Sequence, residues 1–121
     1  MSDSERAQRG NEVRKKLFGA APEPSEHFKD IMDISVEHLF GDIWTRPGLA
    51  MRDRSMITVA ALIVLNREAQ LRVHLRGALN LGISREEIKE MMIHLAHYGG
   101  WPVAMTGMRV ADEVFKELDG D

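Results

Sequence analysis

The fold is decided by residues 68–96, which read EAQLRVHLRGALNLGISREEIKEMMIHLA. Apolar residues recur there at the three- and four-residue spacing of one helix face, which predicts a helix from Glu68 to about Leu81. Its inward residues are Leu71, Leu75, Ala78 and Leu79. Gly82 follows as the expected left-handed residue that ends this helix.

A capping box starts the next helix. In residues 84–87, Ser-Arg-Glu-Glu, the serine side chain can accept from the amide three residues on, while the second glutamate reaches back to the serine amide. We expect this helix to run to about Tyr98 and to break at residues 99–100, Gly-Gly. A last helix then begins with Pro102 in its first turn and ends at about Leu118. The inward residues of the helix that starts at the capping box are Ile88, Met91, Met92 and Leu95.

Two further helix patterns precede this region. Residues 51–65 predict a helix whose second half is apolar nearly all round, which is typical of a helix buried on every side. Before it, Ser25 is the predicted N-cap of a helix that runs to about Phe40 and is stopped by Gly41. Residues 42–48 contain a Pro-Gly pair and are turn-like. The predicted inward residues of the earlier helix are Phe28, Met32, Ser35, Val36 and Leu39.

The first residues of the chain are charged and weakly patterned. We read residues 1–24 as a loosely attached arm followed by a Pro-rich linker, and residues 25–121 as one helical domain. No segment shows the two-residue alternation of a strand. The predicted fold class is therefore all-α, a compact bundle of about six helices.

Length and composition limit the function. The 121 residues suit a single domain, and the net charge of −3 lacks the basic excess of a nucleic-acid binder. The absence of cysteine excludes thiol redox chemistry and thiolate metal sites. The longest apolar run has about ten residues, too few to span a bilayer, and the N-terminus shows no secretory signal. We expect a cytoplasmic protein that binds neither nucleic acid nor membrane.

Positive charge is concentrated between residues 46 and 76, a stretch that contains six arginines and only two acidic residues. Guanidinium groups match carboxylates and phosphates, so a small anionic ligand is favoured. The alternative is a solvated helix face with ion pairs, such as Glu68 with Arg72. The six are Arg46, Arg52, Arg54, Arg67, Arg72 and Arg76.

His74 borders the apolar face of its helix, about 60° from Leu71 around the helix axis. We expect it to be half-buried. Burial would lower its pKa and keep the imidazole neutral near pH 7, where it can take up a proton and return it. The alternative is a core histidine bonded to a backbone carbonyl.

His94 and His97 lie three residues apart, a spacing that raises the question of a metal site. No acidic residue at a suitable spacing completes a ligand set, so we expect no metal. His94 lies near Met91 and Tyr98, at an edge that could line a pocket. His97 points away from the core, towards solvent or an oligomer contact.

Apolar residues exceed the needs of one small core. Ile93 and Ala96 lie off the inward face of their helix, and the helix of residues 51–65 is apolar on several sides. This surplus predicts burial against a second copy of the chain.

From Phe40 to Phe115 the chain resembles the carboxymuconolactone decarboxylase family. The matching motifs, in chain order, are GDIWTRPGL (41–49), RxRS (52–55) with TVAA (58–61), LxxHxxxA (71–78), GISREEIKE (82–90) and YxGxP (98–102). The resemblance implies the helical fold of alkyl hydroperoxidase D-like proteins, assembled as trimers or hexamers. The peroxidase branch carries Cys-x-x-Cys where residues 67–70 read Arg-Glu-Ala-Gln, so the likeness is to the cysteine-free branch.

The resemblance implies a carboxy-lyase of aromatic-compound catabolism that uses no cofactor and acts on a γ-lactone bearing carboxylates. Carbon dioxide leaves from the ring carbon joined to the lactone oxygen. Electrons then pass through the ring double bond into the lactone carbonyl, so the substrate is its own electron sink. The protein has to neutralise charge, stabilise the dienolate and deliver a proton to carbon.

Five side chains are assigned to these tasks. His74 is the predicted proton donor, Arg46 and Arg54 hold carboxylate or enolate, and His94 and Tyr98 complete the substrate site. His94 and the neighbouring Trp101 differ from the residues expected in the decarboxylases proper, which leaves a different enolisable carboxylate as an alternative substrate. A non-catalytic ligand-binding or scaffold oligomer is the other alternative.

Overall fold

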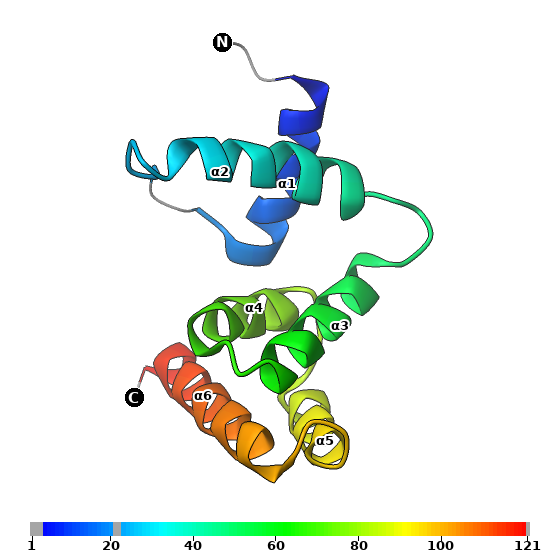
Figure 1. Ribbon diagram of the computed structural model, residues 1–121, viewed down its shortest axis with the longest axis vertical. Helices are drawn as coiled ribbons and strands as arrows, with labels where there is room; N and C mark the ends of the chain where they lie inside the picture. The colour runs from blue at the N-terminus through cyan, green and yellow to red at the C-terminus, as the bar shows by residue number, and fades with distance from the viewer. Residues whose placement is uncertain (1–3, 21–22, 121) are drawn as a thin grey trace. The chain divides into compact units, whose positions relative to one another are not determined.

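The computed structural model describes residues 4–20 and 23–120, and every regular element within these ranges is helical. The all-α class is therefore confirmed. The chain divides into two compact units, Met1–Met51 and Arg52–Asp121. Figure 1 shows the helices of each unit. If the continuous helices α2 and η1 are taken as one, the described residues form six helices, the number expected; five of them correspond to the predicted helix ranges, and α1 is the sixth.

The first unit is built on the contact between α1 (Glu5–Phe18) and the π-helix η1 (Ser35–Ile43). Ser4 caps α1, because its Oγ accepts from the amide of Ala7 at 3.1 Å. Leu17 of α1 is fully buried. This segment is thus a packed helix, in contrast to the loosely attached arm that the sequence predicts. The boundary at residue 24 stays a prediction.

Two glycines let α1 and η1 approach closely. A Cβ on Gly10 would collide with the carbonyl oxygen of Val36, and a Cβ on Gly41 would collide with that of Arg6. The expected helix stop at Gly41 is wrong, because η1 continues through it to Ile43. Gly41 serves a tertiary contact and does not end the helix.

The start of this helix also differs from the prediction. Residues 26–28 form a turn, and α2 (Lys29–Ile34) begins after Phe28 instead of at Ser25. Phe28 and Leu39 are exposed, although the helical spacing places them inward. The π-winding explains part of this difference, since its five-residue hydrogen bonds, such as Trp44 N–H to Leu39 O at 2.9 Å, change which residues share a face.

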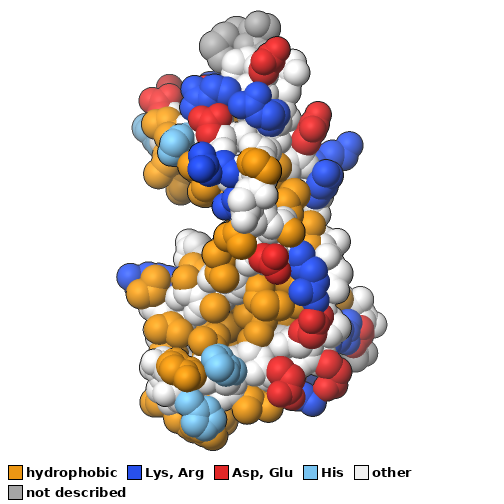
Figure 2. Space-filling view, turned by 90° about the vertical axis from the view of Figure 1, so that its right-hand side faces the viewer, with side chains coloured by type: hydrophobic (Ala, Val, Ile, Leu, Met, Phe, Trp, Pro, Cys, Tyr) orange, Lys and Arg blue, Asp and Glu red, His pale blue; other side chains and the backbone are white. Residues whose placement is uncertain are grey.

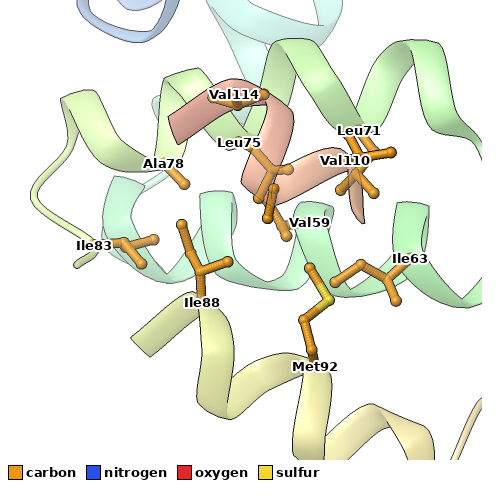
Figure 3. Close-up of a cluster of buried hydrophobic side chains, with 11 residues drawn as sticks. Val59, Ile63, Leu71, Leu75, Ala78, Ile83, Ile88, Met92, Val110 and Val114 are labelled. Carbon is orange, nitrogen blue, oxygen red and sulfur yellow. The ribbon is translucent and has the colours of Figure 1, made fainter. Parts of the chain in front are cut away.

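The second unit contains α4 (Glu68–Asn80), α5 (Arg85–Ala96), α6 (Trp101–Asp119) and nearly all of α3 (Met51–Val64). The side chains of its core meet between these helices (Figure 3). The predicted inward residues of α4 and α5 are buried or half-buried. The core consists of Val59, Ile63, Leu71, Leu75, Ala78, Ile83, Ile88, Met92, Val110, Ala111 and Val114.

Local signals place these helix ends where the sequence predicts them. Gly82 has a positive φ of 91°, and both hydrogen bonds of the Ser84 capping box are present. Gly100 has a φ of 107°, and Pro102 lies in the first turn of α6. Only the end of α5 moves, from about Tyr98 to Ala96.

Helix α3 is less buried than its composition predicts. Ile57 and Leu65, which follows α3, are 57% and 59% exposed, so the other helices of the second unit do not cover this segment on every side. On α5, Ile93 is exposed as expected, whereas Ala96 is buried. Within the described ranges, no helix combines the length and the apolar character that crossing a bilayer requires.

Candidate active site

His74 lies on α4 and is half-buried. Burial lowers the pKa of its imidazole below the usual value of 6.5. The predicted half-burial and the direction of the shift are therefore confirmed. An imidazole in this state is neutral near pH 7 and can pass a proton between solvent and a bound molecule.

Arg54 and Ser55 lie side by side near the start of α3. The Arg54 side chain is half-buried, and its Nε is shielded from solvent. Ser55 is completely buried, and its Oγ has no hydrogen-bond partner among residues 4–20 and 23–120. Buried hydroxyls usually have a partner, which makes Ser55 a site candidate that sequence reasoning missed. Its signal was a serine directly after the Arg-x-Arg motif, at the start of an apolar helix.

Three of the six arginines are used in ion pairs between helices. Arg52 bonds to Glu87 of α5 at 2.5 Å. On α4, Arg72 bonds to Glu113 and Glu117 of α6, and Arg76 bonds to Glu117 at 2.8 Å. These contacts link the helices of the second unit, so Arg52, Arg72 and Arg76 are structural.

The alternative of ion pairs is confirmed for these three arginines, but its example, Glu68 with Arg72, is wrong. Glu68 bonds to Arg109 of α6 instead. Arg72 bonds to Glu113 and Glu117, which also belong to α6. Four-residue spacing permitted the pair within α4, but the packing of α4 on α6 offers both side chains better partners.

The remaining arginines have different positions. Arg46 lies in the first unit, in the exposed turn that follows η1, and Arg67 is exposed between α3 and α4. Arg54 and His74 both belong to the second unit. Arg54 is a half-buried arginine of the second unit and lies beside the buried Ser55 in the sequence.

His94 and Tyr98 are close together at the end of α5. Their rings stack with centroids 4.9 Å apart and an angle of 29°. His94 also lines a hollow of about 490 Å³ between α3 and α5, which confirms that this edge lines a pocket. Neither His74 nor Arg54 is among the residues that line this hollow. The five predicted residues therefore do not share this hollow.

The chemistry of the hollow differs from that expected for an anion site. Its floor is apolar, and its edge carries Glu86, Glu87 and Glu90. The backbone amide of Ser84, and next the guanidinium of Arg52, lower the pKa of Glu87, which keeps this carboxyl charged. An acidic edge repels carboxylates, so a part for His94 and Tyr98 in substrate binding stays a prediction.

His97 lies on the exposed side of the same helix. Its Nδ1 is 2.9 Å from the carbonyl oxygen of Ile93, and its ring meets that of Trp101 edge to face. In the described part of the chain, no three His, Asp or Glu side chains are grouped so that they could hold a metal ion.

Comparison with known proteins places the chain in one family. The model of the "Carboxymuconolactone decarboxylase family" matches residues 29–113. The chain is 36% identical over 124 residues to 4-carboxymuconolactone decarboxylase of Acinetobacter baylyi, covering 98% of this chain and 92% of the relative. It is 30% identical over 115 residues to nitrosuccinic acid decarboxylase of Metarhizium robertsii, covering 90% of this chain and 80% of the relative.

Proposed function

Because the chain belongs to the carboxymuconolactone decarboxylase family, we propose that it is a cofactor-independent decarboxylase of a small carboxylated lactone similar to 4-carboxymuconolactone. The names of both relatives specify loss of carbon dioxide from a carboxylated compound. The higher identity and nearly complete coverage of the first relative favour a lactone over an open-chain acid.

The half-buried His74 is the observation that carries this proposal. When the bond between the ring carbon and the carboxylate breaks, its electron pair enters the lactone carbonyl through the ring double bond. The electrons return when the carbon framework takes a proton. An imidazole whose pKa is lowered by burial gives up a proton readily once it has acquired one from solvent, which suits it to this step.

Arg54 is the proposed contact for negative charge in the substrate. Its shielded Nε and planar fork suit a carboxylate or the developing enolate. Arg46 is the second proposed contact. The three arginines that bond to glutamates are left out, since binding a substrate would require breaking those bonds.

The proposal includes a cytoplasmic homo-oligomer, a trimer or a hexamer. Exposed apolar side chains on α3 and α5 support assembly, because a small protein gains little from leaving such surfaces in water.

Turnover of 4-carboxymuconolactone tests the function. The purified protein, treated with a chelator, is mixed with the lactone while ultraviolet absorption and released carbon dioxide are followed. We expect the absorption to fall with one carbon dioxide released per lactone. No turnover, with or without added metal, would remove this substrate and direct the search to other enolisable carboxylates.

A thermal-shift screen of lactones and keto acids distinguishes a decarboxylase of one of these compounds from a non-catalytic scaffold. A ligand at about a hundred times its dissociation constant adds roughly 2.7 kcal/mol to the free energy of unfolding. If no compound raises the melting temperature and His74→Ala changes only stability, the chain is a non-catalytic oligomer.

A further inference from the structure

We propose that the first unit carries a further binding site, which takes a small organic anion with one carboxylate and an apolar body. The site is a hollow of about 730 Å³ whose lining residues all belong to the first unit. None of the residues assigned to decarboxylation lines it. This inference therefore does not depend on the proposed reaction.

The hollow of the first unit has two helical walls. Figure 1 shows the continuous helix of α2 and η1 crossing α1. From α1 come Asn11, Arg14 and Phe18, which spacings of three and four residues place on one side of that helix. From the opposite wall come Met32 and Val36, four residues apart. A hollow of this volume is typical of sites for small molecules.

Most charged side chains around this hollow are matched by an opposite charge. Lys29 bonds to Asp33 at 2.6 Å, and an oxygen of Glu37 lies 3.5 Å from a guanidinium nitrogen of Arg6. The bond to Asp33 and, to a smaller extent, the charge of Glu23 raise the pKa of Lys29. Figure 2 shows basic and acidic side chains beside one another on one face of the first unit. These groups neutralise one another and leave little charge for a ligand.

Arg14 is the exception. Its side chain lines the hollow and is half-buried, and it forms no hydrogen bond or ion pair with another residue of the described ranges 4–20 and 23–120. Arginine side chains that are withdrawn from water normally have a partner, because an unmatched charge is costly to bury. Lys15 also lines the hollow and forms no such bond within these ranges. Two positive charges of α1 are therefore available to a ligand.

The lining also determines the chemical class of this ligand. The guanidinium of Arg14 matches a carboxylate in a two-bond arrangement, and the apolar side chains of Phe18, Met32 and Val36 offer contacts to a ring or an aliphatic chain.

The number of carboxylates follows from the opposite wall of the hollow. Asp33 and Glu37 lie there, on the helix that faces α1, and their charges would repel a second carboxylate of the ligand. The expected ligand is thus an amphipathic monocarboxylate, in contrast to a phosphate or a compact dicarboxylate.

Isothermal titration calorimetry of the full chain with 4-phenylbutyrate tests the site, because this probe carries one carboxylate and one ring. We expect saturable binding. Acetate lacks the apolar body and 4-phenylbutyramide lacks the charge, so each should bind at least about 10-fold more weakly than 4-phenylbutyrate.

Variants of α1 locate the bound probe. Arg14→Gln removes the charged partner of the carboxylate and should raise the dissociation constant at least about 10-fold. Lys16→Gln is the matched control, since it makes the same change of charge at an exposed side chain that does not line the hollow. It should leave the dissociation constant unchanged.

A charge reversal guards against loss of binding through misfolding. Arg14→Glu should bind 4-phenylbutylamine, the amine of similar shape, more tightly than 4-phenylbutyrate, which is the reverse of the wild-type preference. A gain of this kind requires a folded hollow.

Three results would overturn the proposal. They are a wild-type chain that does not bind 4-phenylbutyrate, an Arg14→Gln chain that binds it like the wild type, and binding that is lost in Arg54→Gln but kept in Arg14→Gln. The last result would assign the probe to the proposed decarboxylase site. Turnover of the lactone is measured separately, so failure of this proposal is distinguishable from failure of the proposed function.

Discussion

Burial distinguishes His74 from the other histidines of the chain, which are exposed. Its pKa in the folded protein is lowered, so the unfolded chain binds a proton on His74 at a higher pH than the folded chain does. The free energy of unfolding should therefore fall as the pH drops from 6.5 towards the lowered pKa. His74→Gln should remove that part of the loss. Urea unfolding of both proteins at about pH 7.5 and about pH 5.5 measures it, and equal losses would contradict the effect of burial.

Arg54 and Arg76 have different predicted roles although both are arginines of the second unit. Arg54→Lys keeps the charge but loses the planar fork, so it should raise KM more than it lowers kcat if the side chain grips a spectator carboxylate. Arg76→Lys is the control, because Arg76 bonds to Glu117, and it should leave both constants nearly unchanged. If Arg54→Lys lowers kcat alone, Arg54 contacts the developing enolate instead.

The close approach of α1 and η1 depends on Gly41, which has no side chain. A Cβ on Gly41 would collide with the carbonyl oxygen of Arg6, and helix backbones cannot yield as a flexible side chain can. Gly41→Ala should lower the free energy of unfolding by about 1–3 kcal/mol, the usual cost of overpacking. At Gly48, a Cβ would meet nothing within 4 Å, so Gly48→Ala should cost much less. Equal effects in urea unfolding would show that the close approach is not as described.

The contact of α4 with α6 accounts for much of the positive charge that looked like an anion site. Arg72→Gln removes bonds to Glu113 and Glu117. We expect a small loss of stability, as is typical of partly exposed ion pairs, and no change in KM beyond about twofold. Steady-state kinetics checks this, and a large rise in KM would return Arg72 to the substrate site.

Local signals predicted the second unit well, and tertiary contacts account for the errors. Gly82, the Ser84 capping box and Pro102 act within a few residues, so α4 ends, and α5 and α6 begin, close to the expected residues. A glycine at position 41 resembles a helix stop in its local sequence, but Gly41 serves the close contact with α1. Because α1 is distant in the sequence, no local pattern reveals this contact. The sequence places His74 at the edge of an apolar face, which predicts its half-burial. It could not predict that Glu113 and Glu117 take Arg72, because that choice is made by the packing of α4 on α6.

At the scale of the whole molecule, the family match at residues 29–113 runs through both units, whereas the proposed proton donor lies in the second. The central claim is that this chain decarboxylates a carboxylated lactone with no cofactor and that His74 delivers the proton.

The steady-state kinetics of His74→Gln test this claim most directly. Glutamine keeps hydrogen-bonding ability but cannot take up and return a proton near pH 7. The measurement is kcat and KM for 4-carboxymuconolactone, with His27→Gln as a control at an exposed histidine of the first unit. We predict that His74→Gln lowers kcat by about 10² to 10⁴, leaves KM little changed, and that His27→Gln matches the wild type. A His74→Gln protein with nearly wild-type kcat would contradict the assignment of the proton to His74.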